Sequence, residues 1–354
     1  MRIGIITLVV LSAGAASIAR ADPVHPPPAG KLYHGLYFDE PKNGHDPTEA
    51  DVTPSDVRRF EEAVGKKAAW VFFSDNWVKS RRFPVEICSW IRDLGKLPYM
   101  RLMLRSDLEQ EHRETLFTLA NIVAGQFDDD LRAWAREAKR FGSPILVEWG
   151  TEPNGNWFSW NGKWNGGAKE GPRRYIAAYR HIVDLMREEG AANLQWIWHV
   201  NWLEEPEAKW NRFENYYPGE NYCSWVALSA YGPLTPRTKD GTESFRFKLR
   251  NAYPRLTKLA PGKPIVIAEF GCTVNHRSVD ASEWARRALD DLFSNRWPAI
   301  IGFCWWNESW ENDDTKLHDT DMNILHDARL TNVFRAELAA HAAQLQETPV
   351  LTNR

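Results

Sequence analysis

Short apolar runs alternate along this chain with longer stretches in which apolar side chains recur every three or four residues. Eight of the runs have the length and composition of strands, at residues 33–38, 69–73, 98–104, 145–149, 194–200, 225–230, 265–270 and 300–305. Most of these runs are apolar on both faces, which is typical of parallel strands covered by helices. The pattern therefore predicts a buried parallel sheet.

The stretches between the strands have the period of amphipathic helices. They include residues 55–64, 131–141, 174–188 and 281–292, and a further helix is predicted at 330–345 after the last strand. Eight strands that alternate with helices predict an α/β protein built as a single (β/α)8 TIM barrel. A doubly wound open sheet is the alternative, but it usually carries a glycine-rich phosphate loop after an early strand, and this sequence has none.

The first residues follow a different pattern. Arg2 precedes an almost continuous apolar run at 3–18, and Ala19 and Ala21 place small residues where a signal peptidase reads them. This pattern predicts a secretory signal peptide at 1–21. An uncleaved membrane anchor is the alternative, but the run is short for a spanning helix, which needs about 20 apolar residues. We expect a secreted or periplasmic protein with no membrane contact after cleavage.

The rest of the chain has the size of one barrel domain. Residues 22–30 are rich in proline and are predicted to be a linker, and residues 31–346 are predicted to form the catalytic domain. A (β/α)8 barrel typically needs about 250 residues and tolerates insertions. The sequence shows no internal repeat and no second domain, and we expect a monomer.

Charge and cysteine content narrow the possible partners. Lys and Arg (44) nearly balance Asp and Glu (47), for a net charge of −3, whereas nucleic-acid binders usually show a basic face. The sequence has four scattered cysteines, Cys88, Cys223, Cys272 and Cys304, without the spacing of a metal site. We therefore expect a neutral partner, no nucleic acid, no cysteine-based metal site, and buried free thiols.

Tryptophan is unusually frequent, with 18 in 354 residues. An indole ring offers a flat apolar surface with one polar N–H group. The C–H face of a sugar ring can lie on such a surface while its hydroxyls bond to polar neighbours. The count alone is a weak indication of carbohydrate binding, because each Trp could equally serve barrel packing, but several of them cluster at predicted strand ends.

The end of the fourth predicted strand carries candidate chemistry. In a (β/α)8 barrel the active site lies at the carboxyl-terminal ends of the strands. Because side chains alternate along a strand, Glu148 and Glu152 are predicted to share the face toward the barrel axis. Glu152 then lies at the mouth, and polar and aromatic residues follow it at once: Asn154, Asn156, Trp157, Trp160 and Trp164.

The seventh predicted strand ends in a second carboxylate, Glu269, after an apolar run. A buried ionisable group is costly unless it is paired, so it needs a structural or a functional reason. The structural reason would be an ion pair with a barrel arginine such as Arg101 or Arg105. We assign that structural role to Glu148, which lies deeper in its strand.

Two carboxylates on opposite walls of a barrel mouth are what glycoside hydrolysis requires. One protonates the leaving oxygen, and the other attacks the anomeric carbon or activates a water. Other strand ends add side chains that could bind a sugar: His199 and Asn201 on the fifth strand, Tyr231 on the sixth, and Trp305 and Trp306 on the eighth. A metal-dependent or Ser/His amide or ester hydrolase would need clusters that His199 alone does not supply.

These motifs resemble glycoside hydrolase family 26. Residues 152–160, Glu-Pro-Asn-Gly-Asn-Trp-Phe-Ser-Trp, are similar to the acid/base signature of that family, and residues 264–271 are similar to its nucleophile strand. Residues 196–201 and 225–231 lie where its fifth and sixth strands would be. The resemblance covers nearly the whole chain after residue 21, and only the first motif is specific by itself.

The resemblance implies a retaining (β/α)8 enzyme that uses no metal and no organic cofactor. Glu152 would be the general acid/base and Glu269 the nucleophile. Tyr231 would hydrogen-bond the nucleophile, and Trp157 would line the subsites beside the cleaved bond. A tryptophan of the eighth strand, either Trp305 or Trp306, would lie under the reacting sugar.

The chain also departs from the family pattern. Typical mannan-cleaving members have histidine directly before the acid/base, where this chain has Thr151, and another at the end of the third strand, where it has Arg101, Arg105 and Ser106. The departures put the substrate in doubt. We expect endo-acting cleavage of β-1,4-mannan. Mixed-linkage β-glucan, β-1,3-xylan or a bacterial exopolysaccharide are alternatives, as is a non-catalytic carbohydrate-binding barrel.

Overall fold

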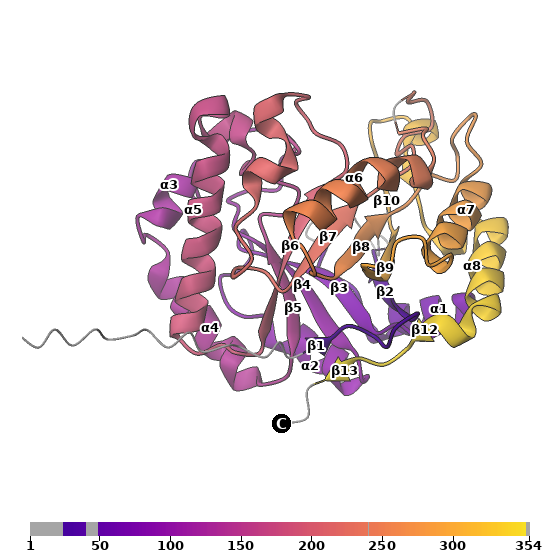
Figure 1. The fold of residues 1–354 in the computed structure, drawn as a ribbon, viewed down its shortest axis with the longest axis horizontal. Coiled ribbons are helices and arrows are strands. Elements are labelled where there is room, and N and C mark those ends of the chain that lie inside the picture. The colour runs from indigo at the N-terminus through magenta and orange to yellow at the C-terminus, as the bar shows by residue number, and fades with distance from the viewer. Residues whose placement is uncertain (1–23, 40–48, 240, 352–354) are drawn as a thin grey trace, which may run out of the picture.

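The eight predicted strands form one closed parallel barrel. The computed structural model describes residues 24–39, 49–239 and 241–351. The barrel strands are β2 (Leu32–Phe38), β3 (Trp70–Asn76), β4 (Leu97–Met103), β5 (Ile145–Trp149), β6 (Leu194–Asn201), β7 (Trp225–Ser229), β8 (Ile265–Phe270) and β9 (Ile300–Asn307). Each pairs with the next, and β2 also pairs with β9, which closes the sheet (Figure 1). The predicted (β/α)8 barrel is confirmed, and the open-sheet alternative is wrong.

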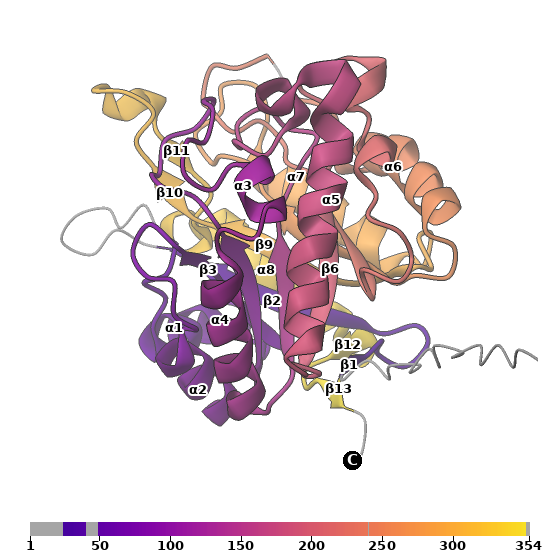
Figure 2. The same ribbon diagram turned by 90° about the vertical axis from the view of Figure 1, so that its left-hand side faces the viewer.

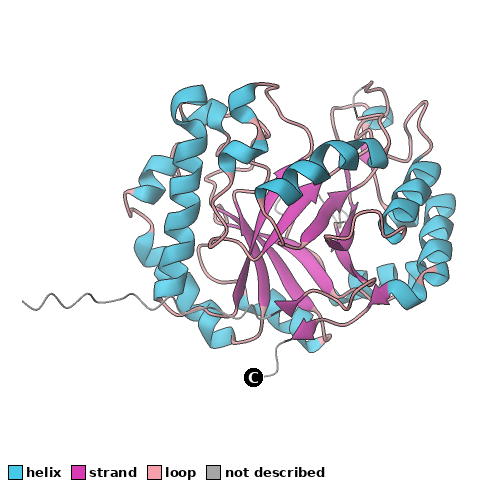
Figure 3. Cartoon of the chain, viewed as in Figure 1, coloured by secondary structure: helices cyan, strands magenta, loops and turns pink. Residues whose placement is uncertain are grey.

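Helices surround the barrel (Figure 3). They are α1 (Pro54–Val64), α2 (Val85–Asp93), α3 (Leu119–Val123), α4 (Asp128–Phe141), α5 (Gly167–Glu188), α6 (Phe245–Leu259), α7 (Ala281–Phe293) and α8 (Ala328–Ala340). The connection from β6 to β7 differs, since it contains only the short 3-10 helices η2 (Lys209–Asn211) and η3 (Phe213–Tyr216). The last predicted helix is shorter than expected and is followed by a 3-10 turn at Ala342–Gln344 (η6).

Local sequence explains where the helices begin and end. The Thr53 side chain accepts a hydrogen bond from the Asp56 backbone N–H and the Asp56 side chain accepts one from Thr53, which forms a capping box before α1. Gly65 ends the helix at φ 71°, a conformation that glycine adopts without steric cost. In α4, three aspartates occupy the first turn and two basic residues the last, which complements the helix dipole.

Much of the tryptophan packs the core. Six tryptophans are fully buried: Trp70, Trp134, Trp149, Trp198, Trp225 and Trp305. Trp70 fills the barrel so closely that a Cβ atom on Gly35 would lie 2.1 Å from its indole nitrogen. Trp149 faces outward as the alternation predicts, and stacks on Tyr175 of α5 with ring centroids 5.6 Å apart. The high tryptophan content is therefore in good part a packing feature rather than a sign of sugar binding.

The two ends of the described chain meet at the amino-terminal end of the barrel. Strand β1 (Val24–His25) pairs antiparallel with β13 (Val350–Leu351), and β12 (Leu345–Gln346) pairs with the start of β2 (Figure 2). Part of the predicted linker at 22–30 is thus a short strand attached to the barrel. The predicted signal peptide at 1–21 lies outside the described residues.

Three further features concern the loops, thiols and membrane prediction. A small hairpin, β10 (Ser309–Trp310) with β11 (Thr320–Asp321), follows β9. All four cysteines are buried free thiols, as predicted. Within the described ranges, no helix combines the length and the apolar character that crossing a membrane requires.

Candidate active site

Glu152 reaches the barrel mouth on a turn rather than on a strand. Strand β5 ends at Trp149, and the next residues take left-handed conformations, with φ of 62° at Gly150 and 48° at Glu152. A Cβ atom on Gly150 would lie 2.6 Å from the Tyr175 ring, so this turn requires glycine. A left-handed backbone at a residue other than glycine costs about 1–3 kcal/mol and is concentrated at functional sites. The alternation argument predicted Glu152 on the inward face of the strand, whereas the structure places it on the turn that follows β5.

Neutral N–H groups hold the Glu152 carboxylate. Trp157 donates from its indole nitrogen to Oε2 at 2.7 Å, and the Asn201 side-chain amide donates to Oε1 at 2.8 Å. The Glu152 backbone N–H donates to the carbonyl of His199 at 2.9 Å. Glu152 is 5% exposed, and Trp157 is partly exposed beside it. Contacts from β6 and from the loop that follows Glu152 thus fix the Glu152 carboxylate at the mouth of the barrel.

Glu269 lies near the end of β8 and is held differently. The Arg101 guanidinium donates from Nη2 to Oε1, and the Tyr231 hydroxyl donates to Oε2 at 2.6 Å. The Tyr231 contact agrees with the prediction from the family resemblance. The ion pair with Arg101 is also present, so the structural and functional reasons for Glu269 are not exclusive. A cation and a phenol hold this carboxylate in its ionised form.

Glu148 lies beneath the mouth and is fully buried. It accepts hydrogen bonds from the Tyr99 hydroxyl at 2.9 Å, Arg101 Nε at 3.1 Å and His199 Nδ1 at 2.9 Å. Burial by itself would raise the pKa of Glu148, but His199 and Arg101 together lower it to about 2. The predicted ion-pair role of Glu148 is confirmed.

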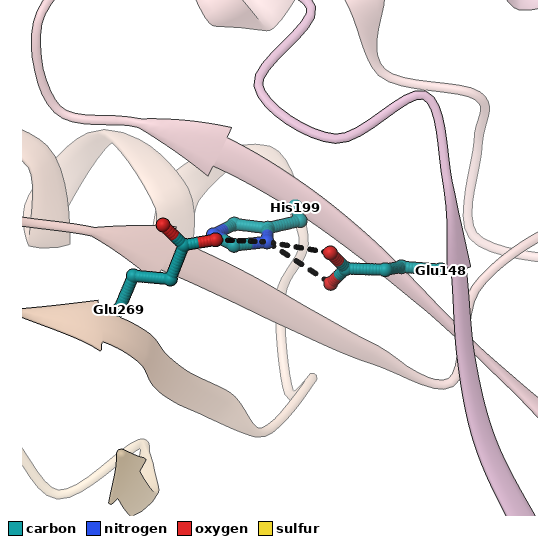
Figure 4. A group of neighbouring side chains, drawn as sticks. All are labelled: Glu148, His199 and Glu269. Atoms are coloured by element: carbon teal, nitrogen blue, oxygen red, sulfur yellow. Dashed lines mark hydrogen bonds and ion pairs between the residues drawn. The ribbon is translucent and has the colours of Figure 1, made fainter. Parts of the chain in front are cut away.

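His199 lies between the two buried carboxylates (Figure 4). Its Nδ1 is 2.9 Å from Glu148 and 4.0 Å from Oε1 of Glu269, and its Nε2 is 2.8 Å from the Ser229 hydroxyl. The Thr151 hydroxyl lies 2.9 Å from the same Nδ1. His199 therefore links the strand that precedes Glu152 to the strand that carries Glu269.

One group of side chains has the geometry of a metal site. Ligand atoms of Glu148, His199 and Glu269 all lie within 4.8 Å of one another. The guanidinium of Arg101 already bonds to both carboxylates and supplies the positive charge there. A second cation at this point would be repelled by Arg101, so these residues fit a guanidinium-centred network better than a metal site.

Trp306 and Glu308 complete the mouth on the side of β9. Trp306 stacks on Tyr37 with ring centroids 3.5 Å apart, and the Arg101 guanidinium lies 5.0 Å from the Trp306 ring. Its indole nitrogen donates to Glu308 Oε2 at 2.5 Å. Burial and the neighbouring Glu49 raise the pKa of Glu308 well above its ordinary value. Trp306 thus faces the same interior as the catalytic carboxylates.

Four of the residues predicted to bind substrate are almost fully buried and contact other parts of the protein. Asn154, Trp160, His199 and Trp305 are each 3% exposed or less. Asn154 bonds to the backbone of Asn201, and Trp160 donates to the Thr151 carbonyl. Trp305 packs among helix residues and donates to the Met322 carbonyl. Of the two tryptophans proposed as the sugar platform, Trp306, itself 4% exposed, is the one that faces the barrel interior beside Arg101.

Sequence reasoning missed part of the network. Glu49 bonds to Arg101 Nη1 at 3.4 Å and accepts from the Ser74 hydroxyl at 2.5 Å. Ser229 bonds to His199 from the end of β7. Glu49 precedes a helix in a segment without periodic pattern, so no sequence signal pointed to it. For Ser229, the one available signal was its position as a polar residue at the end of an apolar run.

The sequence profile described as glycosyl hydrolase family 26 matches residues 118–312, a segment that contains both Glu152 and Glu269. The chain belongs to glycosyl hydrolase family 26. The match also includes Asn201 and Tyr231, which contact the two carboxylates.

Curated relatives of this family 26 protein are longer than the chain. Endoglucanase H of Acetivibrio thermocellus is 27% identical over 260 residues, which is 73% of this chain and 27% of that protein. Mannan endo-1,4-beta-mannosidase of Bacillus subtilis is 26% identical over 176 residues, 49% of this chain and 42% of that protein. The chain thus spans about a quarter to two fifths of the length of these relatives.

Solved structures of family 26 enzymes share the fold. The β-mannanase of Bacteroides ovatus superimposes with a TM-score of 0.61 at 15% identity, covering 90% of both chains. The endo-beta-1,4-mannanase of Cellulomonas fimi gives 0.60 at 17% identity, covering 90% of this chain and 72% of that one. At this level of identity the similarity establishes the barrel fold alone.

Proposed function

We propose that this family 26 protein is a retaining, endo-acting glycoside hydrolase that cleaves a β-linked polysaccharide. The unequal surroundings of Glu152 and Glu269 support this role most directly. Neutral N–H groups hold Glu152, whereas a guanidinium and a phenol hold Glu269. Retaining hydrolysis needs one carboxyl group that exchanges a proton and one that stays ionised.

In the first step Glu269 is the nucleophile. A carboxylate oxygen forms a covalent bond to the anomeric carbon, and the bond from that carbon to the leaving oxygen breaks. Glu152 gives its proton to the leaving oxygen, so the departing sugar chain leaves as an alcohol. Tyr231 and Arg101 keep Glu269 oriented during the attack.

In the second step Glu152, now ionised, removes a proton from a water molecule. The water oxygen bonds to the anomeric carbon, and the bond to Glu269 breaks, which regenerates both carboxyl groups and retains the configuration. Trp157 donates a hydrogen bond to Glu152 and is partly exposed, a position from which it can also contact the sugar beside the cleaved bond. Trp306 would support the reacting sugar.

We propose β-1,4-mannan as the substrate, as two curated relatives have mannan endo-1,4-beta-mannosidase in their names. A β-glucan is the second candidate, because Endoglucanase H aligns over a larger part of this chain than either mannosidase does. Thr151 stands where mannan-cleaving members have one histidine, and Arg101, Arg105 and Ser106 stand where they have another. These departures leave room for that alternative or for an exopolysaccharide. Endo action is proposed from the aromatic side chains at the mouth.

The test is release of reducing sugar from a panel of polysaccharides. The panel contains galactomannan, glucomannan, mixed-linkage β-glucan, β-1,3-xylan and a bacterial exopolysaccharide, with Glu269→Ala as the control. We expect release from a mannan or a β-glucan that the control does not show. Binding to a mannan or glucan affinity gel without any release would contradict the proposal and favour a non-catalytic carbohydrate-binding barrel.

The location of the protein is a separate proposal. We propose that residues 1–21 are a signal peptide and that the catalytic domain at 31–346 acts as a monomer, secreted or in the periplasm. Ala19 and Ala21 after the apolar run support the cleavage site. Amino-terminal sequencing of the exported protein is the test, and an intact amino terminus would contradict it.

A further inference from the structure

Arg101 is a single cation shared by several carboxylates. Its side chain is 3% exposed, and it contacts Glu49 at 3.4 Å, Glu148 at 3.1 Å, and Glu269. The rings of Phe72 and Trp306 each lie 5.0 Å from its guanidinium carbon. These contacts leave the guanidinium little freedom to move. Its position relative to Glu269 is therefore set by the groups on its other sides.

Glu148 is the most buried of these carboxylates and touches no position that a substrate can reach. It is 0% exposed, and three donors converge on it from two strands: Tyr99 and Arg101 on β4, and His199 on β6. His199 in turn approaches Glu269 to 4.0 Å. Arg101 and His199, the two groups next to Oε1 of Glu269, thus both bond to the carboxylate of Glu148.

We propose that Glu148 is a positioning residue for the nucleophile, which fixes Arg101 and His199 and balances the charge of the guanidinium. The inference rests on the proposed function of Glu269. With Glu148 ionised, Arg101 can orient Glu269 while part of its positive charge is already compensated. Glu269 then keeps its direction without being bound so tightly that it becomes a poor nucleophile.

The physical reason is the balance between orientation and reactivity. A carboxylate fully paired with a buried guanidinium is strongly stabilised as the anion, and a stabilised anion attacks less readily. A second carboxylate on the same guanidinium weakens that pairing, because like charges in a buried site repel each other. The low pKa of Glu148 is consistent with a permanently ionised partner.

Other charged or titratable groups also face this network. Glu49 reaches Arg101 from the segment before α1, and Tyr231 bonds to Glu269 from the loop after β7. The charges of Glu152 and Glu308 also act on Arg101 and on Tyr231. Glu148 differs from these because it bonds to both Arg101 and His199.

The test is the pH profile of kcat/KM with an activated aryl β-glycoside, whose leaving group needs no proton from Glu152. In this assay the acid limb reports ionisation of the nucleophile. Glu148→Gln keeps the size of the side chain and removes its charge. We expect the acid limb to move to lower pH by about one unit, because loss of a nearby like charge favours ionised Glu269. We also expect the plateau of kcat/KM to fall by about tenfold or more, while KM changes little.

Glu148→Asp is the matched control, because it keeps the charge. Its acid limb should stay at the wild-type position, even if shortening the side chain lowers the rate. An acid limb of Glu148→Gln that is unchanged or higher would overturn the inference, since a purely structural role would not shift it to lower pH.

A second variant covers the case in which Glu148→Gln does not fold. Arg101→Lys replaces the planar fork by a single ammonium, which cannot hold Glu148 and Glu269 in the same geometry. We expect its acid limb to move to higher pH, and an unchanged acid limb would overturn the inference. Wild-type protein without activity on any β-glycoside would instead mean that the proposed function is wrong.

Discussion

The two candidate catalytic carboxylates lie at the same mouth but are held by opposite kinds of contact. Glu152 accepts hydrogen bonds from the neutral N–H groups of Trp157 and Asn201. Glu269 is bound by the cation of Arg101 and by the hydroxyl of Tyr231. Both sets of donors bond to a carboxylate, but only the set around Glu269 includes a formal positive charge. The two carboxylates therefore differ in the charge of their surroundings, as the proposed roles of acid/base and nucleophile require.

The backbone positions of Glu269 and Glu152 also differ. Glu269 belongs to β8 and pairs with Ser229 of β7, next to an irregularity in the register. Glu152 follows β5 on a left-handed turn that Asn154 ties to β6. The sheet holds Glu269, whereas a left-handed turn presents Glu152.

The largest expected effect comes from removing the nucleophile. Glu269→Ala should reduce turnover of polysaccharide by more than about 10⁴-fold, because no covalent intermediate can form. The protein should still bind polysaccharide on an affinity gel. Added azide should restore part of the activity on an activated glycoside by attacking the anomeric carbon itself. Turnover close to wild type would show that Glu269 is not the nucleophile.

Removing the acid/base should have an effect that depends on the leaving group. In Glu152→Ala, hydrolysis of polysaccharide should fall by about 10²–10⁴-fold, the usual contribution of a general acid. The first step with a dinitrophenyl glycoside should be far less affected, since that group leaves without a proton. Steady-state and burst kinetics on both substrates measure the difference. Equal losses of activity on the polysaccharide and on the dinitrophenyl glycoside would contradict the assignment of Glu152 as the general acid/base.

Tyr231→Phe tests the contribution of the neutral one of the two groups that bond to Glu269. The phenol donates to Oε2 of Glu269 at 2.6 Å, and its loss leaves Arg101 to orient the carboxylate alone. We expect kcat/KM to fall by about 10–100-fold, as for loss of a hydrogen bond to a charged group. Thermal unfolding should be almost unchanged. A large drop in melting temperature with little kinetic change would assign the tyrosine to packing.

Trp157→Phe should have a smaller effect on the other carboxylate. It removes the N–H donor to Glu152 but keeps an aromatic ring, so we expect about a tenfold or smaller loss in kcat/KM. Trp160→Phe is the matched control, since that indole donates to a backbone carbonyl and is buried. It should lower the melting temperature with little direct effect on kinetics. A kinetic loss for Trp160→Phe and a lower melting temperature for Trp157→Phe would contradict this assignment of the two tryptophans.

The smallest effect concerns stability in acid. The pKa of Glu148 is about 2, against an ordinary value of 4.5, so its ionised form stabilises the fold above pH 4.5. This contribution, up to roughly 3 kcal/mol, should be lost as the pH falls from 4.5 through 2. Denaturant unfolding of wild type and Glu148→Gln should therefore converge in acid. A gap that stays constant with pH would mean that packing, not charge, stabilises this position.

Hydrophobic pattern was sufficient to predict the barrel. All eight strands were located because parallel strands are apolar on both faces and helices separate them. The short pairings β1–β13 and β10–β11 were missed, since each is only two residues long and carries no periodic signal. The connection between β6 and β7 was also not predicted, because 3-10 turns have no distinctive period.

Two contacts were predicted, the Tyr231–Glu269 hydrogen bond and the ion pair of Glu148, but the rest of the network was not. Glu152 and Glu269 stood out because they are carboxylates at the ends of apolar strands. The burial of Asn154 and Trp160 was not visible, since a loop that follows a strand can fold either over the mouth or into the core. The sharing of Arg101 among three carboxylates depends on strand order around the closed barrel, which pattern alone does not give.

The pairing of β1 with β13 at the amino-terminal end of the barrel determines where another molecule can be attached. β1 and β13 lie there (Figure 1), whereas Glu152 follows the carboxyl-terminal end of β5 and Glu269 lies near that of β8. A fusion partner or a solid support joined next to Val24 or Leu351 would therefore begin on the side of the barrel that faces away from Glu152 and Glu269.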